Sequence, residues 1–249
     1  MENKVKYYLE IADNAFILSH RLAENSSHGP YLEEDLAVTN TALDLIGMAE
    51  SIYNEAAKMT DEYPTGDDLA YRRSEDEYRN CLLVEQPNVD FAHIMVRQFF
   101  MDTFNYYFLV EAANCNDEFL NAVANKSLKE VTYHIRRSSE WIIRFGQGTK
   151  ESSQRAQSAI NKLWRFTDEL FVPSEASLAL LKSNESVDLE KVKANWTQKV
   201  NEIFYMAELR KPENDFQLYG GKTGTHSEYM GFILGDIQYL TNKYPEATW

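Results

Sequence analysis

The chain has 249 residues, of which 44% are hydrophobic, and a formal net charge of −14. Its length suits one large domain or two small ones, and its apolar content allows a sizeable core. The acidic balance argues against a nucleic-acid-binding protein, because such proteins bind mainly by neutralising phosphates. Two cysteines cannot form a disulfide framework, which fits a reducing cytoplasm.

Residues 1–24 mix charged and apolar side chains and do not resemble a signal peptide. The longest nearly uncharged stretch, from Gln98 to Val110, is too short to span a bilayer and contains Asp102. We therefore expect a cytoplasmic protein with no membrane segment.

Helix signals dominate the sequence, and no run shows convincing strand alternation. Residues 67–87 are mixed and predict a short helix or an irregular segment, and the stretch "RKPENDFQLYGGKTGT" predicts a long loop. In chain order, apolar periodicity and helix start and stop residues predict helices at about residues 2–24, 33–58, 88–113, 117–145, 149–171, 188–208 and 227–243.

Four long helices followed by three shorter ones predict an all-α protein, an antiparallel helical bundle with additional C-terminal helices. The sequence has no internal repeat, no low-complexity tract and no flexible linker. A single domain covering residues 1–249 is therefore the better interpretation.

The long helices carry carboxylates among apolar residues. Asp13, Asp44 and Asp102 lie on the first three expected helices, and Glu130 with His134 lies on the fourth. An ionised carboxylate in a dry core must be paired, protonated or bound to a metal, because burying its charge is costly. Carboxylates that converge from several helices are typical of di-iron bundles, in which two helices supply a Glu and two supply Glu-x-x-His.

The spacing departs from the di-iron pattern. The third residue after Glu130 is Tyr133, the third after Asp44 is Gly47, and the chain contains no Glu-x-x-His. His134 follows Glu130 by four residues, which rotates it by about 100° from the usual ligand position. A pair at this spacing can still bind a metal, so the absence of a histidine on the second helix is the stronger objection.

Three interpretations of these residues remain. The first is a buried polar network, in which the acids pair with His134, with Arg21, Arg97 or Arg137, or with tyrosine hydroxyls. The second is a mononuclear or degraded metal site, and the third is a working di-iron centre. The ligand count favours the polar network.

Two further groups of polar residues have competing interpretations. His226 stands in "GTHSEYMG", where Glu228 and Tyr229 are available for a small site, but the stretch also fits a helix start with Ser227 as the cap. A set of basic residues suits either a polyanion-binding patch or, as is more usual, a solvated helix face with salt bridges. These residues are Arg136, Arg137, Arg144, Lys162 and Arg165.

Several long motifs, in the same order, resemble the C-subunit family of the bacterial phenylacetyl-CoA epoxidases, also called ring-1,2-phenylacetyl-CoA oxygenases. The resemblance extends over nearly the whole chain and is more specific than any short pattern. The motifs that carry it are "HGPYLEEDLAVTNTALDLIGMA", "LLVEQPNVDFA", "KEVTYHIRRSSEWIIRFGQGT", "INKLWRFTDELF" and "GGKTGTHSEYMG".

The resemblance implies a ferritin-like bundle that serves as a structural subunit. In such a complex the di-iron centre lies in a paralogous A subunit, which epoxidises the ring of phenylacetyl-CoA with O2. A separate reductase with flavin and an iron–sulfur cluster supplies electrons from NADPH. No catalytic residue, metal or cofactor is then expected in this chain. Its polar residues become vestiges of a metal site or parts of a polar core, namely Asp13, Asp44, Asp102, Glu130 and His134.

Two other functions remain as alternatives. One is a metal-binding monooxygenase in its own right, with an unusual ligand set around Glu130 and His134, and the other is a ferritin-like protein of independent role, such as metal storage. The sequence also leaves open whether the isolated chain forms a homodimer, which acyl-CoA is the substrate, and whether Arg136 and Arg137 contact CoA phosphates.

Overall fold

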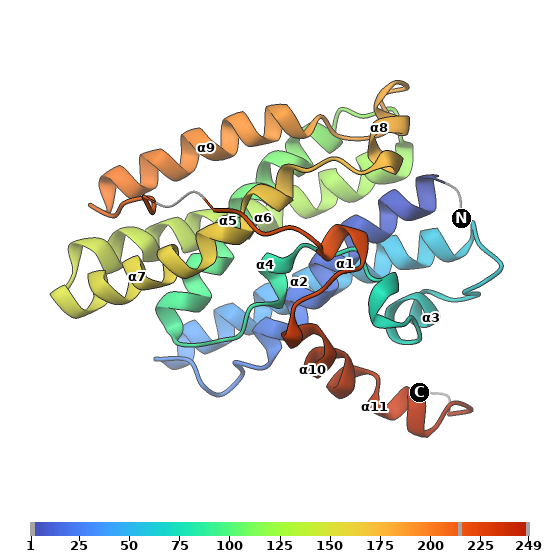
Figure 1. Cartoon of the computed structure of the whole chain (residues 1–249), viewed down its shortest axis with the longest axis horizontal. Coiled ribbons are helices and arrows are strands. Elements are labelled where there is room, and N and C mark those ends of the chain that lie inside the picture. The colour runs from blue at the N-terminus through green and yellow to red at the C-terminus, as the bar shows by residue number, and fades with distance from the viewer. Residues whose placement is uncertain (1–2, 214–215, 248–249) are drawn as a thin grey trace. The chain divides into compact units, whose positions relative to one another are not determined.

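The computed structural model describes residues 3–213 and 216–247, and within these ranges it contains helices and no strand (Figure 1). The predicted all-α class is therefore confirmed. The α-helices are α1 (Asn3–Ala23), α2 (Leu32–Ala57), α3 (Gly66–Tyr71), α4 (Leu82–Glu85), α5 (Phe91–Ala112), α6 (Glu118–Gln147), α7 (Lys150–Leu163), α8 (Glu175–Leu181), α9 (Leu189–Met206), α10 (Glu228–Ile237) and α11 (Tyr239–Lys243).

Three expectations about helix bounds were wrong. The fifth predicted helix ends at Leu163, and the rest of its range forms the 3₁₀ segments Trp164–Phe166 and Asp168–Phe171. The last predicted helix is divided at Gln238 into α10 and α11. Helix α8 was missed because it has only seven residues, although the Ser174 side chain caps it by accepting from the Ser177 N–H.

The chain divides into two compact units. Unit 1 consists of Met1–Pro87 and Tyr219–Trp249, and unit 2 consists of Asn88–Leu218. Whether both belong to the single domain expected over residues 1–249 stays a prediction.

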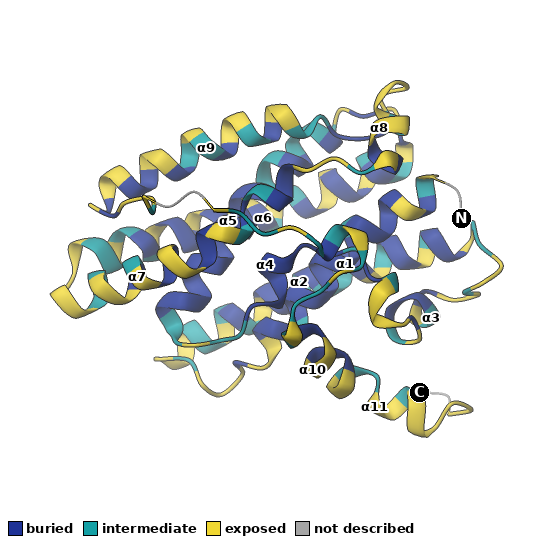
Figure 2. Cartoon of the chain, in the orientation of Figure 1, coloured by how far each residue is buried: buried dark blue, intermediate teal, exposed yellow. Residues whose placement is uncertain are grey.

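Unit 1 is built on the helix pair α1 and α2, which the segment at residues 24–31 joins as an antiparallel hairpin. Helix α1 is buried along most of its length (Figure 2). Ala12 and Ile17 of α1 and Ile52 of α2 are fully buried, so their apolar faces form the core of this unit. Helices α10 and α11 are more exposed.

Unit 2 is built on the long pair α5 and α6, against which α7 and α9 pack. Its core is aromatic: the Phe100 ring centroid lies 5.8 Å from that of Trp164 and 5.7 Å from that of Trp196. The Trp196 indole N–H donates to the Phe100 carbonyl at 2.9 Å, which satisfies its one polar group. Most of the aromatic residues of α5 thus serve the core of this unit.

Gly146, near the end of α6, allows the chain after α9 to approach closely. A Cβ atom at this position would lie 1.8 Å from the Ala207 carbonyl oxygen. We expect Gly146→Ala to lower the free energy of unfolding by about 1–3 kcal/mol, because backbone atoms must move to remove the clash. Urea denaturation measures this loss.

Gly47→Ala is the matched control, because a Cβ atom there meets no atom within 4 Å. Alanine is the better helix former, so this variant should gain about 0.5–1 kcal/mol of stability. Equal stability of the two alanine variants would contradict the proposed close contact at Gly146.

Candidate functional site

Asp13 of α1 is fully buried and is held by an arginine. The Arg73 guanidinium, whose side chain is 1% exposed, forms an ion pair with the Asp13 carboxylate, and its Nη1 lies 3.0 Å from Oδ2. The Tyr53 hydroxyl donates to Oδ1 at 2.5 Å, and the Arg79 backbone N–H donates to Oδ2 at 2.7 Å. Both carboxylate oxygens of Asp13 therefore accept hydrogen bonds from within unit 1.

The ion pair with Asp13 determines the protonation states of Arg73 and Tyr53. Burial alone lowers the pKa of Arg73, but the facing Asp13 carboxylate outweighs burial, so the pKa of Arg73 is raised. Burial and the charge of Asp13 raise the pKa of Tyr53 well above its usual range. Arg73 is therefore a cation and Tyr53 is neutral at pH 7. Asp13, which the sequence suggests as a metal ligand, is therefore already paired with the Arg73 cation.

Asp102 and His134 come together inside unit 2, as the sequence suggests. Asp102 on α5 and His134 on α6 are 1% and 3% exposed, and His134 acts electrostatically on Asp102. Gln98 Nε2 donates to Asp102 Oδ1 at 2.5 Å. Ser138, one turn after His134, donates its hydroxyl to the His134 carbonyl at 3.0 Å. These residues form a buried polar cluster between α5 and α6.

Burial shifts the pKa of the Asp102 carboxyl group upward. The nearby His134, Ser138 and Gln98 offset only part of that increase. A metal needs the deprotonated carboxylate, so an upward pKa shift weakens Asp102 as a ligand. The cluster is better suited to holding two helices together.

Asp44 and Glu130 differ from the expectation. Each is half-buried, on α2 and α6 respectively, so neither is a carboxylate in a dry core. The expectation was wrong because an acid between apolar neighbours in the sequence can still lie at the edge of the buried helix face, where water reaches it. Whether these residues are vestiges of a metal site stays a prediction.

The described residues do not fit a di-iron centre. Such a centre takes bridging carboxylates and histidines from several helices. Among residues 3–213 and 216–247, no group of three or more His, Cys, Asp and Glu side chains is arranged to hold a metal ion. In addition, Asp13 is bound by Arg73, and burial favours the neutral form of Asp102.

A buried glutamate–histidine pair anchors the C-terminal part of unit 1. The side chains of Glu85, the last residue of α4, and His226 are fully buried, and Nδ1 of His226 lies 2.6 Å from Oε1 of Glu85. The N–H and the hydroxyl of Ser227 both donate to Oε2 of Glu85, at 2.8 and 2.5 Å. Asn80 Nδ2 donates to Oε1 at 2.9 Å. The start of α10 is thereby tied to α4.

The sequence prediction for this segment was half right. Ser227 is the N-cap residue of α10, but its hydroxyl binds Glu85 and does not cap the helix. The partners of His226 are Glu85 and the Tyr78 carbonyl, whereas the sequence suggested Glu228 and Tyr229.

The Glu85–His226 pair makes the anchoring of the C-terminal segment pH-dependent. Burial lowers the pKa of His226, but its hydrogen bond to Glu85 and the charges of Glu85 and Glu75 outweigh burial and raise the pKa above 6.5. The stabilisation is therefore fully present below pH 6.5 and is lost as the pH rises through the raised pKa of the folded state.

We expect the rate of proteolytic cleavage within the segment that follows residue 228 to rise between pH 6 and pH 9. This rate is divided by the cleavage rate of an unstructured reference peptide at the same pH. His226→Gln keeps a hydrogen-bonding side chain but cannot titrate, so it should remove the pH dependence. A wild-type cleavage rate that follows the reference peptide over this range would count against the anchor.

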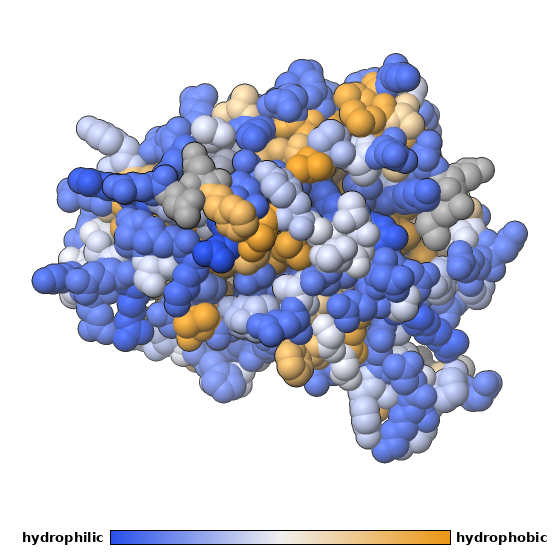
Figure 3. Space-filling model, in the orientation of Figure 1, coloured by the Kyte–Doolittle hydropathy of each residue, from blue (hydrophilic) through white to orange (hydrophobic). Residues whose placement is uncertain are grey.

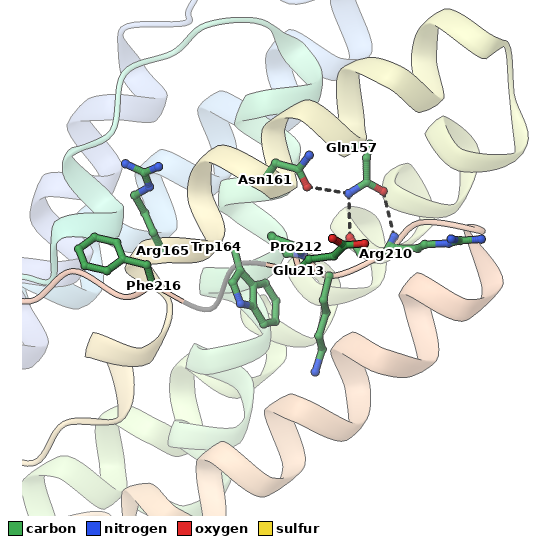
Figure 4. Close-up of a pocket in the computed structure, with 9 residues that line it drawn as sticks. Gln157, Asn161, Trp164, Arg165, Arg210, Pro212, Glu213 and Phe216 are labelled. Atoms are coloured by element: carbon green, nitrogen blue, oxygen red, sulfur yellow. Dashed lines mark hydrogen bonds between the residues drawn. The ribbon is translucent and has the colours of Figure 1, made fainter.

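Unit 2 has a cavity of about 580 Å³ beside α7 (Figure 4). Gln157 fixes one wall, because its side chain accepts from the Arg210 N–H at 2.9 Å and donates to the Arg210 carbonyl at 2.8 Å. The basic groups around it do not converge: Arg165 and Arg210 point in different directions, and Lys211 lies over the Trp164 ring. These basic side chains therefore do not build an anion site.

The basic residues of α6 are divided between the surface and the interior. Arg136 and Arg144 are exposed and lie 3.9 and 3.8 Å from Glu140, as expected for a solvated face. Arg137 is 9% exposed and interacts electrostatically with buried Asp102. The favoured interpretation, a solvated helix face with salt bridges, therefore fits Arg136 and Arg144 but not the buried Arg137.

Sequence reasoning missed Arg73 and Glu85. Glu85 had a usable signal, because it is the lone charge in the apolar run "LLVEQP", as Asp102 is in the stretch "QFFMDTFNYYFLV". Arg73 lies in "YRRSEDEYR", where nothing local distinguishes it from exposed neighbours such as Arg72. Its partner Asp13 is sixty positions away in the sequence.

No helix among the described residues has the length and apolar character needed to cross a membrane. The face of the molecule in Figure 3 is mainly hydrophilic, with separate apolar groups.

The described residues form a helical protein in which Arg73, Tyr53, Gln98 and His226 bind three buried carboxylates, those of Asp13, Asp102 and Glu85. The sequence matches the family model described as "Phenylacetic acid catabolic protein" over residues 1–249. It is also 40% identical to the C subunit of the 1,2-phenylacetyl-CoA epoxidase of Escherichia coli (strain K12), over 100% of both chains. The chain belongs to the phenylacetic acid catabolic protein family.

Proposed function

We propose that this chain is a non-catalytic structural subunit of a multicomponent 1,2-phenylacetyl-CoA epoxidase in aerobic phenylacetate catabolism. The observation that carries the proposal is its 40% identity, along the complete length of both chains, to a protein named as the C subunit of that enzyme.

In this proposal the chemistry belongs to a partner. The chain pairs with a paralogous subunit that holds the di-iron centre, and a reductase with flavin and an iron–sulfur cluster supplies electrons from NADPH. The two buried cysteines, Cys81 and Cys115, form no disulfide with each other, which fits assembly in a reducing cytoplasm. The ion pair between Asp13 and Arg73 supports a structural role, because a guanidinium satisfies a carboxylate that a catalytic bundle would direct at iron.

A rigid, non-catalytic subunit can stabilise a catalytic subunit that binds metal. A bundle that carries metal ligands gives up part of its apolar core, and docking against a well-packed neighbour can hold its ligand geometry. In the present chain the aromatic core of unit 2 and the Glu85–His226 anchor supply such rigidity.

The alternative is a metal-binding monooxygenase in its own right. The proximity of Asp102 and His134 is the observation in its favour, since a carboxylate and an imidazole together are common metal ligands. The upward shift in the pKa of Asp102 and the half-exposed position of Glu130 disfavour it.

Reconstitution from separately purified subunits tests the proposed function. We expect the paralogous catalytic subunit with its reductase to epoxidise phenylacetyl-CoA only when this chain is added, and this chain with reductase alone to form no product. Full activity of the catalytic subunit without this chain, or product formed by this chain alone, would refute the proposal.

A further inference from the structure

Helix α2 carries a row of exposed leucines on the face opposite its core contacts. Leu32, Leu36 and Leu43 are 71%, 53% and 61% exposed. Their spacing of four and seven residues places them along one face of the helix. Single exposed leucines are ordinary, but three on one face, with only the exposed Asn40 between Leu36 and Leu43, form an apolar stripe of the kind that another protein covers.

Gly47 continues the same row, four residues after Leu43. A Cβ atom at this position would have no atom within 4 Å, so no close packing within the described chain requires a glycine. Glycine is unfavourable in the interior of a helix. A group from outside the chain that approaches the α2 backbone at this point gives the glycine a physical reason.

The charges around the row are of one sign. Helix α2 has 26 residues and contains no lysine or arginine. It contains six acidic residues, Glu33, Glu34, Asp35, Asp44, Glu50 and Glu55. A second copy of this chain docked by the same face would set acidic flanks against acidic flanks, which is repulsive. The complementary partner has an apolar row flanked by lysines or arginines.

We propose that the α2 row, defined as Leu32, Leu36, Leu43 and Gly47, is the docking face for a helix of the paralogous catalytic subunit that has an apolar row and basic flanks. This inference rests on the proposed function, since it names the surface through which the structural subunit binds its partner. The leucines fill the apolar contact, Gly47 permits close helix approach, and the acidic flanks set orientation and exclude self-pairing.

Titration of the full-length chain with the purified paralogous catalytic subunit, followed by calorimetry, tests the surface. Leu43→Glu should weaken binding by roughly 30-fold or more, because it removes an apolar contact at the centre of the row and places there a carboxylate that must lose its water when the apolar row is covered. Gly47→Leu should also weaken binding, yet leave the melting temperature of the isolated chain unchanged or higher, because leucine is the better helix former. Raising the salt concentration should weaken the wild-type complex.

Leu178→Glu is the matched control, because Leu178 of α8 is 48% exposed and lies outside the row. Its dissociation constant should stay within about threefold of wild type, as expected for a residue outside the interface. If the wild-type chain binds the catalytic subunit and Leu43→Glu binds it equally well, the docking face is wrong and the proposed function stands. If the wild-type chain fails to bind, the proposed function fails and this inference with it. A wild-type homodimer that Leu43→Glu dissociates would overturn the choice of partner.

Discussion

Replacing Arg73 with methionine should lower the free energy of unfolding by roughly 3–5 kcal/mol, because it leaves the Asp13 carboxylate buried without its cation. Asp13 is 0% exposed, and hydrogen bonds from Tyr53 and the Arg79 backbone alone would then have to hold its charge. Urea denaturation followed by circular dichroism at pH 7 measures the loss.

Two variants separate this explanation from a general loss of packing. Arg72→Met changes the neighbouring arginine, which is 50% exposed and pairs with Asp68 at 3.2 Å, and should cost less than about 1 kcal/mol. The double variant Asp13→Leu with Arg73→Met removes both charges, so we expect it to recover about half of the loss or more. Similar destabilisation by Arg72→Met and Arg73→Met would show that the buried pair has no special role.

Phe100→Ala should lower the free energy of unfolding by roughly 3–5 kcal/mol, because it removes the ring at the centre of the unit 2 core and leaves a cavity. Phe100 is fully buried and contacts Trp164 and Trp196, and its ring centroid lies 6.2 Å from that of Phe204. The large neighbouring rings can relax only partly into the space, so most of the lost contact energy is not regained.

Phe232→Ala provides the control for the same chemical change at the surface, since Phe232 is 70% exposed. We expect it to change the free energy of unfolding by no more than about 0.5 kcal/mol. If Phe100→Ala had the same urea midpoint of unfolding as the wild type, the aromatic cluster would not stabilise unit 2.

The long helices are predictable from the sequence because their signals are local. Apolar periodicity runs through each of them, and capping residues mark several starts: Asp90, Asp117 and Thr149 each accept a hydrogen bond from a backbone N–H of the helix that follows. The 3₁₀ segments after α7 keep much of the same local pattern, so the sequence predicts one longer helix there.

The buried polar contacts were only partly predictable, because the residues that bind each buried acid are distant from it in the sequence. The position of an acid among apolar residues correctly identified Asp13 and Asp102 as buried. It could not identify Arg73, which comes from a short segment without strong periodicity. Glu85 and His226 are separated by 141 residues, so only the folded chain brings them together.

Metal content of the isolated chain, expressed in iron-supplemented cells and measured by mass spectrometry, tests the central claim most directly. The structural-subunit account predicts less than about a tenth of an iron atom per chain, since no complete di-iron ligand set of the known pattern is present in the sequence. Close to two irons per chain, lost when Glu130 or His134 is replaced, would contradict the account and make this chain an oxygenase candidate itself.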